Sequence, residues 1–168
     1  GAVAAKLLEV FPNAHVTCLD LAENMIAVAR ERLGHLSRVD FIVADFSDYK
    51  LESRYDAAVS SLALHHLESD IDKMNLYRRL FDCIHPGGVF YNADVVLASS
   101  DYLESINRSE WIRFMSLSLS MEEIEGTWLP KAREEDHPAR LTDHLRWLAE
   151  AGFIDGDVIW KHYGFAVY

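Results

Sequence analysis

Three aspartates lie at or near the ends of short apolar segments in this 168-residue chain. They are Asp20, Asp45 and Asp94. A carboxylate at the first position can accept paired hydrogen bonds from a ribose diol, as acidic residues do in dinucleotide-binding folds. Asp45 can accept a hydrogen bond from the exocyclic amino group of adenine, with Phe46 and Met25 offering apolar faces to the ring. These residues predict an adenosine site, and capping of the following helix is the alternative role of Asp20.

The segments that position these aspartates alternate between helix and strand. Helices are predicted at Ala2–Val10, at Glu23–Leu33 and from Ser69 onward, and strands at His15–Leu19, Val39–Ala44, Tyr55–Ser60 and Val89–Leu97. This alternation predicts an α/β fold, a Rossmann-like doubly wound sheet of mostly parallel strands with helices on both faces. Right-handed connections place the carboxyl ends of the strands at one edge, where ligands of such sheets bind.

The C-terminal part departs from this alternation. Two helices are predicted at about Asp101–Leu119 and Met121–Leu129, and we interpret residues 99–140 as a helical insertion that forms a lid over the ligand edge. A helix at Thr142–Ala151, ended by Gly152, precedes strands at Val158–Trp160 and Phe165–Tyr168. These strands are expected to form an antiparallel pair at the end of the sheet. Residues 1–168 are therefore expected to form a single domain.

The chain begins with Gly1 directly before a predicted helix. A natural domain seldom begins on a bare glycine at a helix start, so we expect a fragment whose first strand is missing. A loose N-terminal helix is the alternative. A missing inner strand would leave apolar faces exposed, which makes a homodimer possible.

Composition narrows the classes of partner. The chain has 16 basic and 27 acidic side chains and a net charge of −11, which argues against general binding to nucleic-acid phosphates. No apolar run approaches the roughly 18–20 residues of a membrane span, so we expect neither a nucleic acid nor a membrane as partner. Cys18 and Cys83 are too few for a disulfide scaffold, which favours a reduced, cytoplasmic setting.

Four motifs follow one another in the order and spacing of a known family. They read LDLAENM at Leu19–Met25, VADF at Val43–Phe46, YDAAVSSLALHHL at Tyr55–Leu67 and HPGGVF at His85–Phe90. Together they resemble class I S-adenosylmethionine-dependent methyltransferases, most closely the small-molecule branch with a single methyltransferase domain. The resemblance covers nearly the whole chain. It implies S-adenosyl-L-methionine as cofactor and a small molecule as methyl acceptor.

The resemblance also implies roles for individual residues. Asp20 is expected to bind both ribose hydroxyls of the cofactor, and Asp45 its adenine amino group. Leu21 and Met25 would pack on the adenosine beside Phe46, Ser60 and Ser61 would approach the methionine part, and Gly1 matches the last glycine of the family's glycine-rich loop. The earlier glycines of that loop, which belong to the part that holds the methionine end, are absent.

The sulfonium methyl group is already activated, so its transfer is expected to be an in-line displacement that depends mainly on proximity and alignment. His65 and Asp94 are the candidate catalytic residues, because an acceptor that arrives protonated needs a base. Helix capping or packing is the alternative role of His65, and bonding to loop amides that of Asp94. Candidate substrate contacts on the insertion helix are Asn107, Trp111 and Arg113, with core packing of Trp111 and a solvated Arg113 as alternatives.

No metal site is expected. Neighbouring side chains such as His65 and His66 rarely point at one ion, and the spacing of Asp136, His137 and His144 fits no helical ligand motif.

Three further functions stay open. One is an enzyme that uses the same cofactor differently, such as one that makes a carboxylated cofactor for tRNA modification. Another is a nicotinamide-dependent dehydrogenase, which shares the glycine-to-aspartate spacing but does not account for Asp45-Phe46. The third is a truncated domain without catalytic activity.

Overall fold

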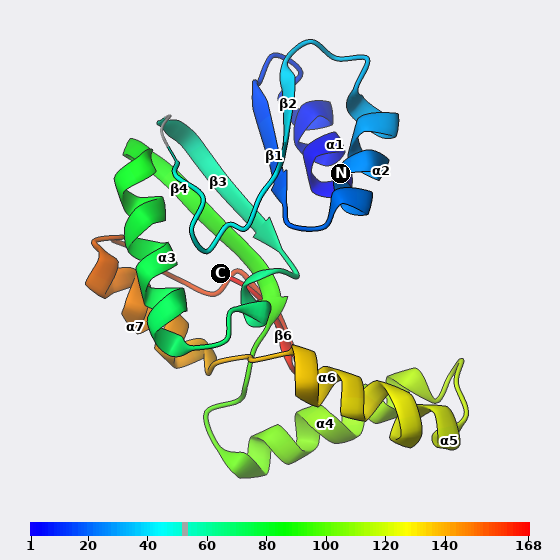
Figure 1. Ribbon diagram of the computed structural model, residues 1–168. Helices are drawn as coiled ribbons and strands as arrows, with labels where there is room; N and C mark the ends of the chain where they lie inside the picture. The colour runs from blue at the N-terminus through cyan, green and yellow to red at the C-terminus, as the bar shows by residue number, and fades with distance from the viewer. Residues whose placement is uncertain (52–53) are drawn as a thin grey trace. The chain divides into compact units, whose positions relative to one another are not determined.

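The structure, a computed structural model, describes residues 1–51 and 54–168 (Figure 1). The chain divides into two compact units, Gly1–Lys50 and Leu51–Tyr168. The first contains a two-stranded sheet of order β1-β2, and the second a four-stranded sheet of order β3-β4-β6-β5. The α/β class with parallel neighbours and an antiparallel C-terminal pair is confirmed, and the strands of the described residues form two sheets.

The first unit is a parallel strand pair packed with two helices. Its elements are α1 (Ala2–Val10), β1 (Val16–Asp20), α2 (Glu23–Leu33) and β2 (Val39–Val43). Its buried apolar centre is formed by Ala4, Leu8, Leu33 and Val39. The parallel register pairs Asp20 with Val43, so both strands end at the same edge of this sheet.

The second unit contains the four-stranded sheet and the remaining helices. Its elements are β3 (Tyr55–Ser61), a 3-10 turn η1 (Leu64–His66), α3 (Asp70–Cys83), β4 (Ile84–Val95), α4 (Asp101–Met115), α5 (Met121–Glu123), a π-helix η2 (Ile124–Trp128), α6 (Leu129–Glu135), α7 (Leu141–Ala151), β5 (Trp160–His162) and β6 (Phe165–Val167). Figure 1 shows α3 and α7 side by side next to this sheet. β3 and β4 pair parallel, whereas β6 pairs antiparallel with both β4 and β5. The predicted antiparallel ending is therefore confirmed.

The largest difference from the predicted elements is the start of β4. The predicted strand began at Val89, but β4 begins at Ile84 and includes the His-Pro-Gly-Gly segment. Tyr55 pairs with Ile84 and Ala57 with Val89, so the segment is accommodated as an irregularity of the strand pair. The second helix of the insertion also differs from its prediction as one helix at about Met121–Leu129. The segment consists of α5, η2 and α6, which follow one another as far as Glu135.

Two helix starts follow the predicted capping chemistry. Ser69 accepts a hydrogen bond from the Asp72 amide, and the Asp72 side chain accepts one from the Ser69 amide in return. Ser120 and Glu123 form the same reciprocal pair before α5. Both are capping boxes, which satisfy backbone donors that have no partner within the helix.

The end of α7 depends on a glycine. Gly152 has φ +112°, and a Cβ at this position would lie 2.7 Å from the Phe81 ring. We expect Gly152→Ala to lower the free energy of unfolding by about 1–3 kcal/mol, because it adds backbone strain to this overlap. Gly126→Ala is the matched control, since a Cβ there meets no atom within 4 Å and the helical backbone favours alanine.

Urea unfolding of both variants measures the difference. Equal stability of Gly152→Ala and the unsubstituted chain would contradict the strain at this helix end.

The two cysteines, Cys18 and Cys83, are free thiols. Within the part of the chain that the structure describes, none of the helices combines the length and the apolar character required to cross a bilayer.

Candidate functional site

The turn after β3 carries the first polar residues of the site. Ser60 and Ser61 end the strand, and Leu62 then adopts φ +50°, which is uncommon for a residue other than glycine. The Leu62 amide donates to the Ala93 carbonyl at 2.9 Å and so fastens the turn to β4. The chain next enters η1, which holds His65 and His66.

Asp94 is the buried centre of this region. Its Oδ2 accepts hydrogen bonds from the amides of Leu64 and His65 at 3.0 and 3.2 Å. Its Oδ1 lies 2.5 Å from Nδ1 of His65. The loop-amide role considered for Asp94 is thus present, and the same carboxylate also fixes the orientation of the His65 ring. Because Asp94 occupies Nδ1, Nε2 is the imidazole nitrogen that remains available to another partner.

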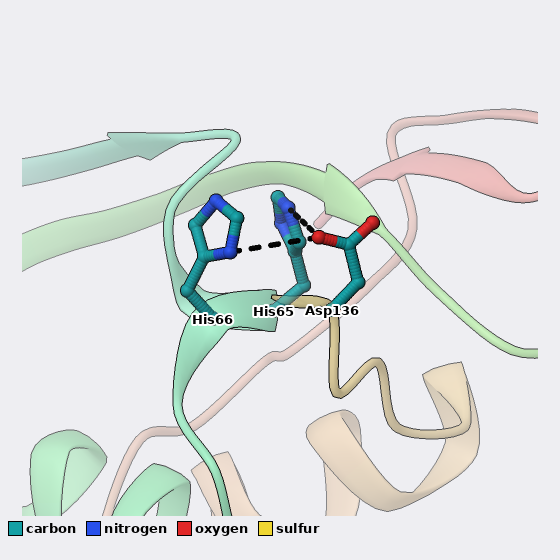
Figure 2. Close-up of side chains that lie close together, drawn as sticks. All are labelled: His65, His66 and Asp136. Carbon is teal, nitrogen blue, oxygen red and sulfur yellow. Dashed lines mark ion pairs between the residues drawn. The ribbon is translucent and has the colours of Figure 1, made fainter. Parts of the chain in front are cut away.

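The far side of His65 faces a second carboxylate (Figure 2). Asp136 Oδ1 lies 3.6 Å from His65 Nε2 and 3.5 Å from His66 Nδ1. The two imidazole rings have their centroids 4.1 Å apart. Adjacent histidines were expected to point apart, but the tight 3-10 turn brings both rings to one carboxylate. Asp136 therefore lies beside His65 and His66. The sequence had grouped it instead with His137 and His144.

Opposing influences act on the charge of His65. Burial lowers its pKa, whereas the hydrogen bond to Asp94 and the negative charges of Asp94 and Asp136 raise it. The carboxylates outweigh burial, so the pKa of His65 lies above its usual value. Asp94 and Asp136 therefore favour a cation at this place.

A second cluster of buried polar side chains lies next to Asp94. Asn92 Nδ2 donates to the Tyr168 hydroxyl at 2.8 Å, and Tyr168 lies 3.3 Å from the Tyr77 hydroxyl. The Tyr77 hydroxyl in turn lies 2.6 Å from Nδ1 of His144. Burial lowers the pKa of His144 to about 4. Asp94 and Asp143 act to raise this pKa, while Lys73 lowers it further.

We expect this histidine to make stability depend on pH. Its folded-state pKa is about 4 against 6.5 in the unfolded chain, so the unfolded state binds more protons between these values. Stability is therefore fully present above pH 6.5 and falls as pH decreases toward 4, by about 3 kcal/mol from this group. The measurement is the free energy of unfolding in urea at several pH values.

The control for this dependence is His144→Asn, because an asparagine oxygen can still accept from Tyr77. The acidic side chains of the chain also titrate in this range, so the difference between the two proteins is the quantity that matters. Parallel pH profiles would contradict the assignment to His144.

The adenosine-binding candidates lie in the first unit. Asp20 ends β1 and Asp45 follows β2, its parallel neighbour, so both carboxylates belong to one sheet edge. Asp20 Oδ1 accepts from the Ala22 amide at 2.9 Å, which fixes the turn into α2. Leu21 and Met25 are exposed apolar side chains beside it, 62% and 48% accessible. Adenosine binding by these residues stays a prediction.

Gly1 and Phe46 belong to the same unit. A Cβ on Gly1 would lie 2.9 Å from Cα of Ala29, so this glycine allows a close approach of the chain to α2. Phe46 is half-buried next to Asp45. Close helix packing is one of the roles that a glycine has in dinucleotide-binding loops.

The substrate candidates all lie on α4. Asn107 is buried, with its Nδ2 3.4 Å from Glu104 Oε2, and Trp111 is half-buried. Arg113 is exposed and pairs with Glu110, which is the solvated arrangement considered for it. Substrate contact by these three residues stays a prediction.

Sequence reasoning missed three contributors to the buried polar groups. Asn92, Tyr77 and Tyr168 are buried, and the sequence pattern places them only within a strand or a helix. Their alternation and helical spacing predict that they face inward but do not indicate which polar atoms meet.

Comparison with known proteins identifies similar chains. Residues 1–88 match a protein family described as Methyltransferase domain. Over 88 residues the chain is 32% identical to malonyl-[acyl-carrier protein] O-methyltransferase 1 of Ilyobacter polytropus, a match covering 52% of this chain and 32% of that protein. Over 165 residues it is 22% identical to carboxy-S-adenosyl-L-methionine synthase of Wolinella succinogenes, covering 93% and 65% of the two chains.

The fold also has counterparts among solved structures. Phosphoethanolamine N-methyltransferase 2 of Haemonchus contortus, in complex with S-adenosyl-L-methionine, is similar with a TM-score of 0.67 and 22% identity. The match covers 94% of this chain and 32% of that one. The chain spans about a third to a half of the length of the first curated relatives it matches.

Proposed function

Because this chain belongs to the methyltransferase domain family, we propose that it transfers a methyl group from S-adenosyl-L-methionine to a small-molecule acceptor by in-line displacement. The observation that carries the proposal is the pair of aspartates at the ends of two neighbouring parallel strands: Asp20 is the last residue of β1, and Asp45 follows β2. Paired acidic groups at such an edge match the hydroxyl and amino groups of adenosine.

The residues of the first unit fit the adenosine part of this cofactor. We assign the ribose hydroxyls to the Asp20 carboxylate and the adenine amino group to Asp45. The exposed side chains of Leu21 and Met25 offer apolar surface for the ring, and Phe46 lies next to Asp45 in the chain. Burial of this apolar surface by a ligand is favourable by about 25 cal/mol per Å².

The methionine part is assigned to other residues of the motifs. We propose that Ser60 and Ser61, where β3 ends, approach it, and that Gly1 takes the position of the family's last loop glycine. Glycine suits a backbone that must come close to a ligand, because it has no Cβ.

The catalytic proposal rests on His65 and Asp94. When bound, the cofactor supplies an activated methyl group, so the protein has to align the acceptor, which can contribute about 7–11 kcal/mol. His65 Nε2 is proposed to take the proton of an acceptor that arrives protonated, while Asp94 holds the ring at Nδ1. Asn107, Trp111 and Arg113 of α4 are the proposed acceptor contacts.

Two experiments test this function. Titration of S-adenosylhomocysteine into the chain, followed by calorimetry, is expected to show saturable binding at one site. Incubation with S-adenosylmethionine that carries a labelled methyl group, together with panels of carboxylic acids, phenols and amines, is expected to yield a methylated small molecule. A folded chain that neither binds S-adenosylhomocysteine nor transfers label would contradict the proposal.

The carboxylated-cofactor alternative is not favoured by the relatives that match the motifs at 32% identity or more, such as the malonyl-[acyl-carrier protein] O-methyltransferase. The mass of the product separates the two chemistries, because one adds a methyl group to an acceptor and the other adds a carboxyl group to the cofactor. We also propose a cytoplasmic location, since both cysteines are free thiols. A homodimer and the absence of nucleic-acid binding stay predictions.

A further inference from the structure

We propose that His65, His66 and Asp136 form a binding site for a divalent first-row transition cation such as Zn²⁺. The three side chains offer two imidazole nitrogens and one carboxylate oxygen, which all lie within 4.8 Å of one another (Figure 2). The site lies entirely in the second unit. Its cation binding does not depend on methyl transfer.

The separations within the cluster fit an ion better than direct hydrogen bonds. Asp136 Oδ1 lies 3.6 Å from His65 Nε2 and 3.5 Å from His66 Nδ1. An N–H···O hydrogen bond has its heavy atoms about 2.7–3.2 Å apart. Tetrahedral ligands with bonds of about 2.0–2.1 Å are separated by roughly 3.3 Å, which is close to both separations from Asp136 Oδ1.

Asp94 supplies the outer support that metal-binding histidines generally have. Its Oδ1 lies 2.5 Å from His65 Nδ1, which turns Nε2 toward Asp136. A carboxylate on the other nitrogen fixes the tautomer and raises the basicity of a ligating imidazole. Asp94 is itself held by the amides of Leu64 and His65, so its support is rigid.

The backbone ties the two ligand-bearing segments together. His65 and His66 belong to η1, and Asp136 directly follows the last residue of α6. The His137 amide donates to the His65 carbonyl at 2.7 Å, which fastens the segment after α6 to the turn. His66 Nδ1 also lies 3.2 Å from the Glu135 carbonyl, a contact that cation binding would replace.

The donor set selects the class of cation. Imidazole nitrogens suit zinc, iron, nickel and copper, whereas Mg²⁺ and Ca²⁺ prefer all-oxygen sites. Three protein ligands leave at least one position for water or another small ligand, as in open zinc sites. Asp94 and Asp136 surround the site with negative charge, in a chain whose net charge is −11.

The cation would compete with the catalytic role of the same histidine, a consequence that rests on the proposed function. His65 Nε2 cannot both take a proton from an acceptor and bind a metal ion. Zn²⁺ is therefore expected to lower methyl transfer to a protonated acceptor, and a chelator is expected to restore it. Binding without loss of transfer would contradict the role of His65 as a base but leave the cation site intact.

Direct binding measurements test the site without any substrate. ZnCl₂ is titrated into the chelator-treated 168-residue chain by calorimetry, and Co²⁺ is added separately to record its visible absorption. We expect one Zn²⁺ per chain and no competition by Mg²⁺ in excess. Bound Co²⁺ is expected to show the visible absorption bands of a low coordination number. His66→Ala and Asp136→Asn are each expected to weaken Zn²⁺ binding by at least about tenfold, since even the loss of an outer-sphere partner costs about 10–100-fold.

The matched control is His137→Ala, which removes a neighbouring exposed imidazole but keeps the backbone hydrogen bond to His65. This variant is expected to bind Zn²⁺ like the unsubstituted chain. His66 is half exposed, so its truncation leaves the buried core in place, and circular dichroism of each metal-free variant verifies the fold. Absence of binding, or Zn²⁺ affinity that is the same in all four proteins, would overturn the proposal, because two of the eight histidines belong to the site and the other six could bind the ion elsewhere.

Discussion

Replacing Asp94 with asparagine is expected to lower methyl transfer to a protonated acceptor by about 10²- to 10⁴-fold, the usual contribution of a positioned base. The carboxylate lies 2.5 Å from His65 Nδ1 and holds the ring with Nε2 turned outward. An asparagine can present its NH₂ group to Nδ1, which favours the tautomer with a proton on Nε2 and so removes the base.

The same substitution should also reduce stability. Asp94 is 3% exposed, and its Oδ2 accepts from the amides of Leu64 and His65. Hydrogen bonds to a charged group contribute about 1.5–3 kcal/mol, so part of this stabilisation is lost when the charge is removed. Urea unfolding at pH 7 measures the loss of stability. Methyl-transfer assays at urea concentrations below the unfolding midpoint separate the loss of activity from the loss of stability.

An exposed carboxylate on the same sheet provides the comparison. Asp56→Asn in β3 changes the net charge equally but is expected to leave transfer unchanged. A carboxylic acid acceptor, which arrives deprotonated, gives a second check because it needs no base. An equal loss of activity with both kinds of acceptor would mean that Asp94 acts on structure alone.

Asp20→Asn is expected to weaken S-adenosylhomocysteine binding by about 10- to 100-fold, because one charged acceptor for the ribose diol is lost. The asparagine oxygen can still accept from the Ala22 amide, the 2.9 Å contact that holds the turn into α2. The substitution therefore separates ligand binding from the local fold more cleanly than alanine would. Calorimetric titration gives the dissociation constant directly.

Asp40→Asn is the matched control for this measurement. Asp40 is an exposed residue in β2, opposite Thr17 of β1 and away from the carboxyl ends of the two strands. It is expected to bind S-adenosylhomocysteine with unchanged affinity. If Asp20→Asn also binds S-adenosylhomocysteine with unchanged affinity, the ribose role of Asp20 is wrong. The family and the fold class would not be affected by that result.

The sequence was sufficient for the elements whose signals are local. The helix over Glu23–Leu33 follows from apolar residues at helical spacing, and Ser69 with Asp72 predicted the start of α3 because a capping box needs only four consecutive residues. The positions of Asp20 and Asp45 at or just after the ends of two strands also followed from alternation along the chain. Together with the four motifs, these signals were enough for the fold class and the family.

Local signals were weaker where strand pairing decides the outcome. The His-Pro-Gly-Gly segment carries turn residues, so the start of β4 at Ile84 could not be predicted from them. Pairing with β3 draws these residues into the sheet as an irregular stretch between Ile84 and Val89. Register is a property of two strands, and only the folded sheet fixes it.

The polar clusters were decided by tertiary structure alone. Asp136 meets His65 because the segment after α6 is fastened to the turn after β3, and His144 meets Tyr77 because α7 packs on α3. These partners are far apart along the chain, and their sequence neighbourhoods carry no mark of the pairing. Composition and periodicity determine which residues turn inward, whereas the packing of whole elements determines which buried polar atoms come within bonding distance of each other.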